Sequence, residues 1–148
     1  MLPVDITERS QTETLAFQID LPHRPEKVWR ALTEPALLSE WLLPVLGIDL
    51  VPDGPLTLQA PSFPGWDGKV RCQFTVVEAP RKLSYRWIVG EMELDTIVTF
   101  TLEPSPAGTR LLITQSGFQP HQKKNFGGAR YGWKMMGEKL VALLTTIT

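Results

Sequence analysis

Three carboxylate side chains lie two residues apart at Glu91, Glu93 and Asp95. If this segment is extended, all three share one face of a strand, because successive side chains alternate between faces. Such a row could hold a divalent cation or supply a carboxyl group for acid–base chemistry. A solvated strand end is the simpler interpretation. Arg71 and Arg86 would then pair with these acids across strands, or could bind a ligand carboxylate through two hydrogen bonds.

Aromatic side chains give the strongest signal for a binding site. The chain has five Trp, six Phe and two Tyr, and large aromatic surfaces suit an apolar or planar ligand. Trp29 is expected in the core, because the helical face on which it lies needs a buried partner. Four others fit a pocket wall as well as they fit a core: Trp41, Trp66, Trp87 and Trp133. The turn-rich segment 61–66 carries Phe63 and Trp66, and suits either a lid over a pocket or a loop pinned to the core.

Other reactive residue types give weaker signals. His23 and His121 lie beside prolines in loop-like segments, and no serine lies in a nucleophile elbow, so no hydrolase is expected. Cys72 alternates with Val70 and Phe74 on the apolar side of a strand, which predicts a small core residue and not a reactive thiol. Without a phosphate loop, a dinucleotide fingerprint or metal-ligand spacing, neither a cofactor nor a metal is expected.

Composition excludes several classes of function. Lys and Arg number 15 against 16 Asp and Glu, which gives a net charge of −1, so binding to nucleic acid is not expected despite a local basic cluster at Lys123, Lys124, Arg130 and Lys134. The single cysteine allows no internal disulfide, which favours the cytoplasm. Because no apolar stretch approaches the roughly 20 residues that a spanning helix needs, no membrane span is expected.

The hydrophobic pattern predicts the elements that must position these residues. Alternation predicts a strand over 14–21, and prolines at 25 and 35 each suit the first turn of a short helix. Alternating segments after residue 69 predict four consecutive antiparallel strands. Five prolines and three glycines make the segment 44–66 ambiguous, with Asp53-Gly54 as a turn between short strands. Apolar residues at helical spacing predict a long amphipathic C-terminal helix that begins near 126–130.

This order of elements predicts an α+β fold in a single domain over 1–148, with 1–12 as a mobile lead-in. A curved antiparallel sheet of about six or seven strands would wrap around the C-terminal helix, and two short helices would follow the first strand. The sheet is the one large surface that could cover the apolar face of that helix. Space left between them would form a cavity.

Several motifs in this order resemble the Bet v 1/START-like (SRPBCC) superfamily, and within it the group named after the C-terminal domain of the activator of Hsp90 ATPase. The resemblance extends over residues 15–147. It is carried by PEKVWRALTEP at 25–35 with Trp41, by Asp67-Gly68, by PRKL at 80–83 with Trp87, by VTFTLE at 98–103, by GTRL at 108–111, and by Gly132-Trp133 with Leu140 and Leu144.

The resemblance implies a helix-grip fold with a hydrophobic cavity between the sheet and the C-terminal helix. Members of the superfamily include lipid and hormone binders, polyketide cyclases and co-chaperones, so the fold alone does not select a function. The Hsp90 activator itself has an additional N-terminal domain, for which 148 residues leave no room. This difference counts against chaperone activation.

The sequence therefore predicts a protein that binds a small hydrophobic or amphipathic molecule in this cavity. The expected walls are Trp41, Phe63, Trp66, Phe74, Trp87, Phe100, Phe118, Trp133 and Met136, with Tyr85 or Arg86 as polar anchors. An alternative is a polyketide cyclase/dehydratase-like enzyme that uses the same cavity with Tyr85, Arg86 and one acid from 91–95. A second alternative is a co-chaperone-type module with an exposed apolar patch. A homodimer and a chaperone partner are both compatible with the sequence.

Overall fold

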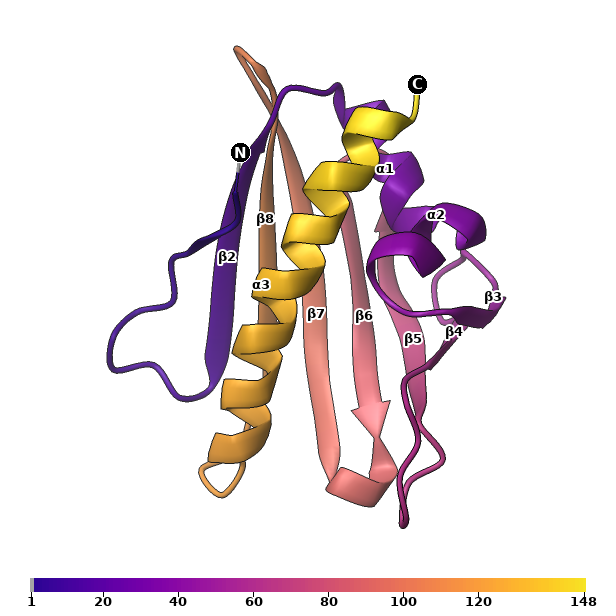
Figure 1. Ribbon diagram of the computed structural model, residues 1–148, viewed down its shortest axis with the longest axis vertical. Helices are drawn as coiled ribbons and strands as arrows, with labels where there is room; N and C mark the ends of the chain where they lie inside the picture. The colour runs from indigo at the N-terminus through magenta and orange to yellow at the C-terminus, as the bar shows by residue number, and fades with distance from the viewer. Residues whose placement is uncertain (1) are drawn as a thin grey trace.

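Residues 2–148 are described by a computed structural model and form an antiparallel sheet crossed by a long helix (Figure 1). The sheet order is β1-β2-β8-β7-β6-β5-β4-β3. The strands, in chain order, are β1 (Val4–Asp5), β2 (Thr14–Leu21), β3 (Val45–Ile48), β4 (Pro55–Gln59), β5 (Lys69–Glu78), β6 (Lys82–Val89), β7 (Leu94–Ser105) and β8 (Gly108–Ser116). The predicted α+β helix-grip fold is thus confirmed, with eight strands in place of six or seven.

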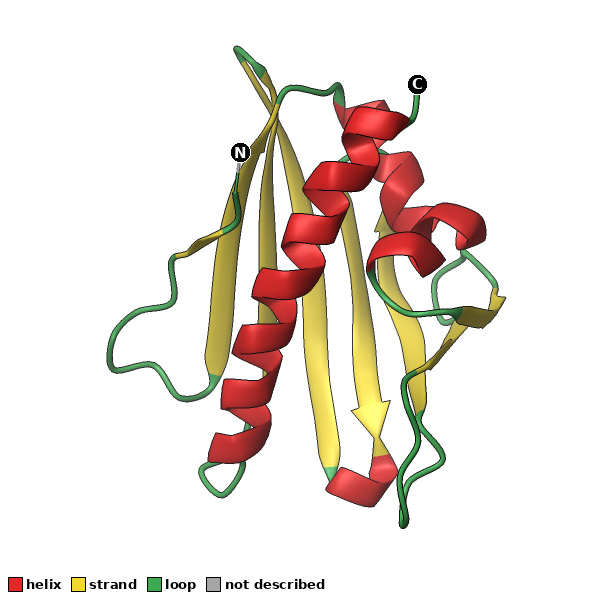
Figure 2. Ribbon diagram, viewed as in Figure 1, coloured by secondary structure: helices red, strands yellow, loops and turns green. Residues whose placement is uncertain are grey.

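Three α-helices cover one face of the sheet (Figure 2). They are α1 (Pro25–Thr33), α2 (Pro35–Trp41) and α3 (Lys123–Thr146), and a short 3₁₀ helix η1 (Gly90–Met92) connects β6 to β7. Pro25 and Pro35 occupy the first turns of α1 and α2, as predicted, because a helix leaves its first N–H groups without partners. Within residues 2–148, no helix is long and apolar enough to cross a membrane.

The core lies between the sheet and the helices. Inward-facing residues of β2 alternate with outward-facing ones, as the sequence predicts, and Leu15, Phe17 and Ile19 are almost completely buried. Trp41 of α2 packs edge-on against Phe100 of β7, with ring centroids 6.2 Å apart. Trp29 is partly buried against the same core.

The connection between β7 and β8 is tight. β7 continues to Ser105 and β8 begins at Gly108, so only Pro106 and Ala107 lie between the two strands. Gly108 has a φ of +150°, and a Cβ atom there would lie 2.5 Å from the backbone N of His23 and 2.5 Å from the carbonyl O of Leu21. The absence of a side chain therefore lets this turn lie directly against the backbone that leaves β2.

The segment predicted to be a mobile lead-in contains the edge strand β1. Val4 and Asp5 pair with Gln18 and Phe17 of β2. The Asp5 carboxylate lies 3.1 Å from the guanidinium of Arg130 on α3. These contacts join the N-terminal segment to both the sheet and the long helix.

Candidate functional site

A cleft of about 410 Å³ lies between the N-terminal half of α3 and the sheet. Its sheet side consists of Val70 on β5, Trp87 and Val89 on β6, Leu94 on β7 and Gln115 on β8. Four of these five side chains are apolar. The cleft therefore offers a largely hydrophobic surface within the size range of small-molecule sites.

One face of α3 forms the opposite side of the cleft. Its lining residues recur at helical spacing, and they are Lys124, Asn125, Gly128, Ala129, Gly132, Trp133 and Met136. A Cβ atom added at Gly128 would meet no atom within 4 Å, and one added at Gly132 would meet only the Met136 side chain, at 3.5 Å. Because small residues occupy the middle of this face, α3 and the sheet leave space between them.

Trp66 lines the cleft and lies in the loop that connects β4 to β5. Its indole Nε1–H donates a hydrogen bond of 3.2 Å to the carbonyl O of Lys69. The backbone groups of Phe63 and Trp66 exchange two hydrogen bonds across Pro64-Gly65, and Gly65 has a φ of +97°. Proline followed by a glycine with positive φ is typical of a type II turn. This tight turn places the ring centroids of Phe63 and Trp66 5.4 Å apart.

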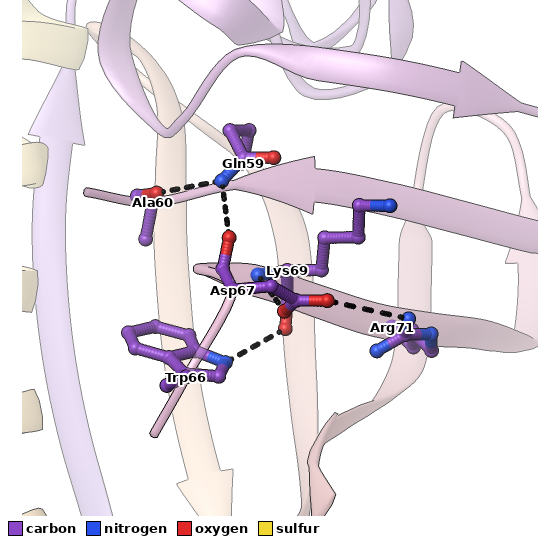
Figure 3. A network of polar contacts seen from close by, with 6 residues as sticks. All are labelled: Gln59, Ala60, Trp66, Asp67, Lys69 and Arg71. Atoms are coloured by element: carbon purple, nitrogen blue, oxygen red, sulfur yellow. Dashed lines mark hydrogen bonds and ion pairs between the residues drawn. The ribbon is translucent and has the colours of Figure 1, made fainter. Parts of the chain in front are cut away.

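Polar contacts of the neighbouring residues hold this loop in place (Figure 3). The Gln59 side-chain amide donates hydrogen bonds of 2.9 Å to the carbonyl groups of Ala60 and Asp67. The Asp67 carboxylate accepts a hydrogen bond of 2.9 Å from the backbone N–H of Lys69 and lies 3.8 Å from Arg71. The hydrogen bonds of Gln59 and Asp67 therefore hold the two ends of the loop together, and the loop in turn positions Trp66.

A buried polar network lies at the innermost part of the cleft. The Trp133 indole N–H donates a hydrogen bond of 2.8 Å to Oε1 of Gln115, and Nε2 of Gln115 donates one of 2.8 Å to the hydroxyl of Thr96. The Thr96 hydroxyl in turn donates to the carbonyl O of Trp87, at 3.4 Å. Gln115 is only 3% exposed, so its amide requires these partners. The network links the Trp133 indole to the backbone of Trp87, and the ring centroids of these two indoles lie 6.2 Å apart.

The structure brings together four of the eleven residues expected to form the site. Trp66, Trp87, Trp133 and Met136 line the cleft. Another group lies in the core between sheet and helices and does not line it: Trp41, Phe74, Tyr85, Phe100 and Phe118. Phe63, in the segment 61–66, is 53% exposed and does not line the cleft.

Neither expected polar anchor faces the cleft. Tyr85 is 1% exposed, packs edge-on against Phe74, and has a hydroxyl without a hydrogen-bond partner. Burial raises the pKa of this hydroxyl well above its ordinary value, since the charged form is poorly solvated there. Arg86 follows Tyr85 and therefore points to the opposite face of the sheet, where its guanidinium makes two hydrogen bonds, of 3.3 and 2.6 Å, to the Asp95 carboxylate.

The row of carboxylates that an extended segment 91–95 would produce does not form. Residues 90–92 adopt the 3₁₀ helix η1, and Glu93 has the left-handed conformation with a φ of +53°. The alternation on which the expectation depended is thus lost between Glu91 and Asp95. None of the three acids lines the cleft, and no cluster of three metal-ligating side chains occurs within residues 2–148.

Sequence reasoning missed the small residues and Gln115. The spacing of Gly128, Ala129 and Gly132 on one helical face is visible in the sequence, and it is the signal that locates the open part of the helix. Gln115 lies on the inner face of β8, as the alternation with Leu111 and Ile113 indicates. A polar residue at an inward-facing strand position is a sign of a buried network or site.

A second hollow, of about 470 Å³, lies on the other side of α3. It is lined by Pro3, Asp5, Phe17 and Arg130 together with Gly127, Tyr131 and Lys134. The ion pair of Asp5 with Arg130 lies in its wall. Three of its seven lining residues are charged, against one of the sixteen that line the cleft beside Trp133, so the latter offers the better environment for an apolar ligand.

A sheet that wraps around a C-terminal helix and leaves an apolar cleft between them defines a helix-grip domain. The family model described as Activator of Hsp90 ATPase homolog 1-like protein matches residues 22–145, and the chain belongs to this family. This confirms the resemblance seen in the sequence motifs. No curated protein matches the chain.

Solved structures support the same assignment. Protein MLL2253 from Mesorhizobium loti is 38% identical, with a TM-score of 0.81 over 91% of this chain and 98% of that one. Protein CV1439 from Chromobacterium violaceum is 25% identical, with a TM-score of 0.74 over 89% of this chain and 96% of that one. CalU16 from Micromonospora echinospora shares the fold at 19% identity, with a TM-score of 0.73 over 97% of this chain and 83% of that one.

Proposed function

We propose that this protein binds a small apolar or amphipathic molecule in the cleft between α3 and the sheet. One observation carries the proposal: the indoles of Trp66, Trp87 and Trp133, from a loop, a strand and a helix, meet at one cleft of about 410 Å³. Aromatic walls contribute large apolar areas that lose water when a ligand binds.

Substitution of the small residues of α3 tests this arrangement. Leucine at both Gly128 and Gly132 would place two large side chains in the cleft. Leucine at Gly127 is the matched control, because Gly127 lines the hollow on the other side of α3 and its Cβ would also meet no atom within 4 Å. All three substitutions replace a glycine within a helix by a strong helix former, so both variants are expected to fold.

The experiment titrates each variant with N-phenyl-1-naphthylamine, a neutral apolar probe whose fluorescence rises in an apolar site. We expect binding to the wild type and to Gly127→Leu, and at least about tenfold weaker binding to Gly128→Leu/Gly132→Leu. No binding to the wild type would overturn the proposal. So would weaker binding to Gly127→Leu alone, since the probe would then occupy the hollow beside Asp5 and Arg130.

The two alternative functions receive less support. The cyclase-like alternative relied on Tyr85, Arg86 and an acid from 91–95, and none of these side chains lines the cleft. The co-chaperone alternative relied on a contiguous apolar patch. The exposed large apolar side chains are Leu2, Val4 and Ile6 near the N-terminus, Leu46 on β3, Val51 and Phe63 in loops, Ile97 on β7, and Tyr131 and Met135 on α3.

A further inference from the structure

We propose that the ligand of the cleft carries an acidic group, which is recognised by Lys124. This inference rests on the proposed function and narrows it to a class of ligand: an amphiphile with a flat apolar body and one anionic end. Lys124 lies in the first turn of α3, and its side chain is exposed where the cleft meets the surface.

The charge of the cleft supports this assignment. Lys124 is the one charged residue in the lining, and no acidic side chain contributes to it. Lys124 takes part in none of the ion pairs formed within residues 2–148. Glu93, which follows η1, has its carboxylate 3.9 Å from the imidazole of His121, and Glu91 within η1 takes part in none of these ion pairs. The ammonium group at the mouth of the cleft is therefore free to pair with a ligand.

The other polar groups of the lining also present hydrogen-bond donors. Asn125 directs its side-chain NH₂ at the thioether of Met92, 3.8 Å away, which is a weak acceptor. Oε1 of Gln115 already accepts from Trp133, while one N–H of its amide is not used by Thr96. A ligand that brings oxygen acceptors gains these donors and the charge of Lys124. A cationic ligand would instead meet an unpaired ammonium group of the same sign.

Two fluorescent probes separate the apolar and the charged contributions. 1-Anilinonaphthalene-8-sulfonate and N-phenyl-1-naphthylamine have the same rings, and only the first carries an anionic group. Each would be titrated into the wild type, Lys124→Gln and Lys123→Gln. Lys123→Gln is the matched control, since Lys123 is the exposed neighbour that does not line the cleft.

We expect Lys124→Gln to weaken binding of the sulfonate probe about two- to fivefold, the size expected for an ion pair near the surface. Binding of the neutral probe to Lys124→Gln should not change. Lys123→Gln should change the affinity for either probe by less than Lys124→Gln changes the affinity for the sulfonate probe. Raising the salt concentration should weaken binding of the sulfonate probe to the wild type more than to Lys124→Gln.

Each outcome bears on one of the two proposals. Suppose that the neutral probe binds the wild type. If Lys124→Gln then weakens the binding of both probes equally, or weakens the binding of neither, the assignment of Lys124 is wrong while the proposed function stands. Equal effects of Lys123→Gln and Lys124→Gln on the sulfonate probe would also overturn it, because net charge alone would then explain them. If the neutral probe does not bind the wild type, the proposed function itself fails.

Discussion

The indole N–H of Trp133 donates a hydrogen bond of 2.8 Å to the side-chain oxygen of Gln115, and thereby links α3 to β8 in the interior. Both residues are buried. We expect Gln115→Met to lower the free energy of unfolding by about 1–3 kcal/mol, because the Trp133 N–H loses its acceptor inside the protein. Urea denaturation measures this change.

A double-mutant cycle isolates the interaction between these two side chains. Trp133→Phe removes the donor, and the double variant removes both partners. The double variant should lose less stability than the sum of the single variants, by about 1 kcal/mol, because it leaves no polar group of this pair without a partner. Strict additivity would show that the hydrogen bond contributes nothing to the link between α3 and β8.

Gly127 and Gly137 should respond differently to substitution by alanine. A Cβ atom at Gly127 meets open space, whereas one at Gly137 would lie 2.6 Å from Cγ of Pro3. Gly127→Ala should raise the free energy of unfolding by about 0.5–1 kcal/mol through helix propensity. Gly137→Ala should lack this gain and should speed amide hydrogen exchange in β1, which the new methyl group displaces. Equal stabilisation by both substitutions would show that β1 does not depend on this contact.

Tyr85→Phe removes a buried hydroxyl that has no hydrogen-bond partner. At pH 7 we expect the free energy of unfolding to stay the same or rise by about 1 kcal/mol, since the desolvation penalty of the hydroxyl disappears. Tyr131→Phe, at a residue that is 66% exposed, is the control and should have no effect. A clear loss of stability in Tyr85→Phe alone, measured by urea denaturation, would contradict this description of the site.

Alkaline pH should destabilise the wild type more than Tyr85→Phe. Burial raises the pKa of Tyr85 in the folded protein, whereas the unfolded chain loses this proton near pH 10. Above that pH the unfolded state binds fewer protons than the folded state, so the free energy of unfolding falls as pH rises. Parallel pH profiles of the wild type and Tyr85→Phe between pH 9 and 11 would contradict the prediction.

Cys72 should be inert in the folded protein. Burial raises the pKa of its thiol, and only the thiolate reacts with disulfide reagents. With 5,5′-dithiobis(2-nitrobenzoic acid) at pH 8, labelling of the native protein should be at least about a hundredfold slower than in 8 M urea, because access requires opening of the structure. Comparable rates would place Cys72 at an accessible site.

Local patterns predicted most of the fold because each element buries one regular face. The alternation in β2 and the prolines at 25 and 35 are local signals, and tertiary packing agrees with them. The alternation of Val70, Cys72 and Phe74 does not continue along β5, since a register shift lies between Phe74 and Val76, and Val77 packs against the core. An extra residue of this kind bends its strand and increases the local twist of the sheet. Its position depends on the pairing with the neighbouring strand, which a local pattern does not show.

The site was less predictable than the fold, because an inward-facing aromatic residue can fill the core or line the cleft. Phe100 and Trp87 both face inward, yet only Trp87 lies opposite the small residues of α3. This difference depends on where α3 crosses the sheet. The sequence shows the glycines of that helix, but not the strand that each of them faces.

The antiparallel pairing of β2 with β8 joins Thr14 to Ser116 and Leu21 to Thr109. A nascent chain released from the ribosome only as far as residue 100 would therefore contain the apolar face of β2 without the strand that pairs with it. Contacts between such distant parts of a chain slow folding. Completion of the sheet must therefore wait for synthesis of β8, and until then one edge of β2 lacks its partner strand, which is the kind of edge that can pair with another chain.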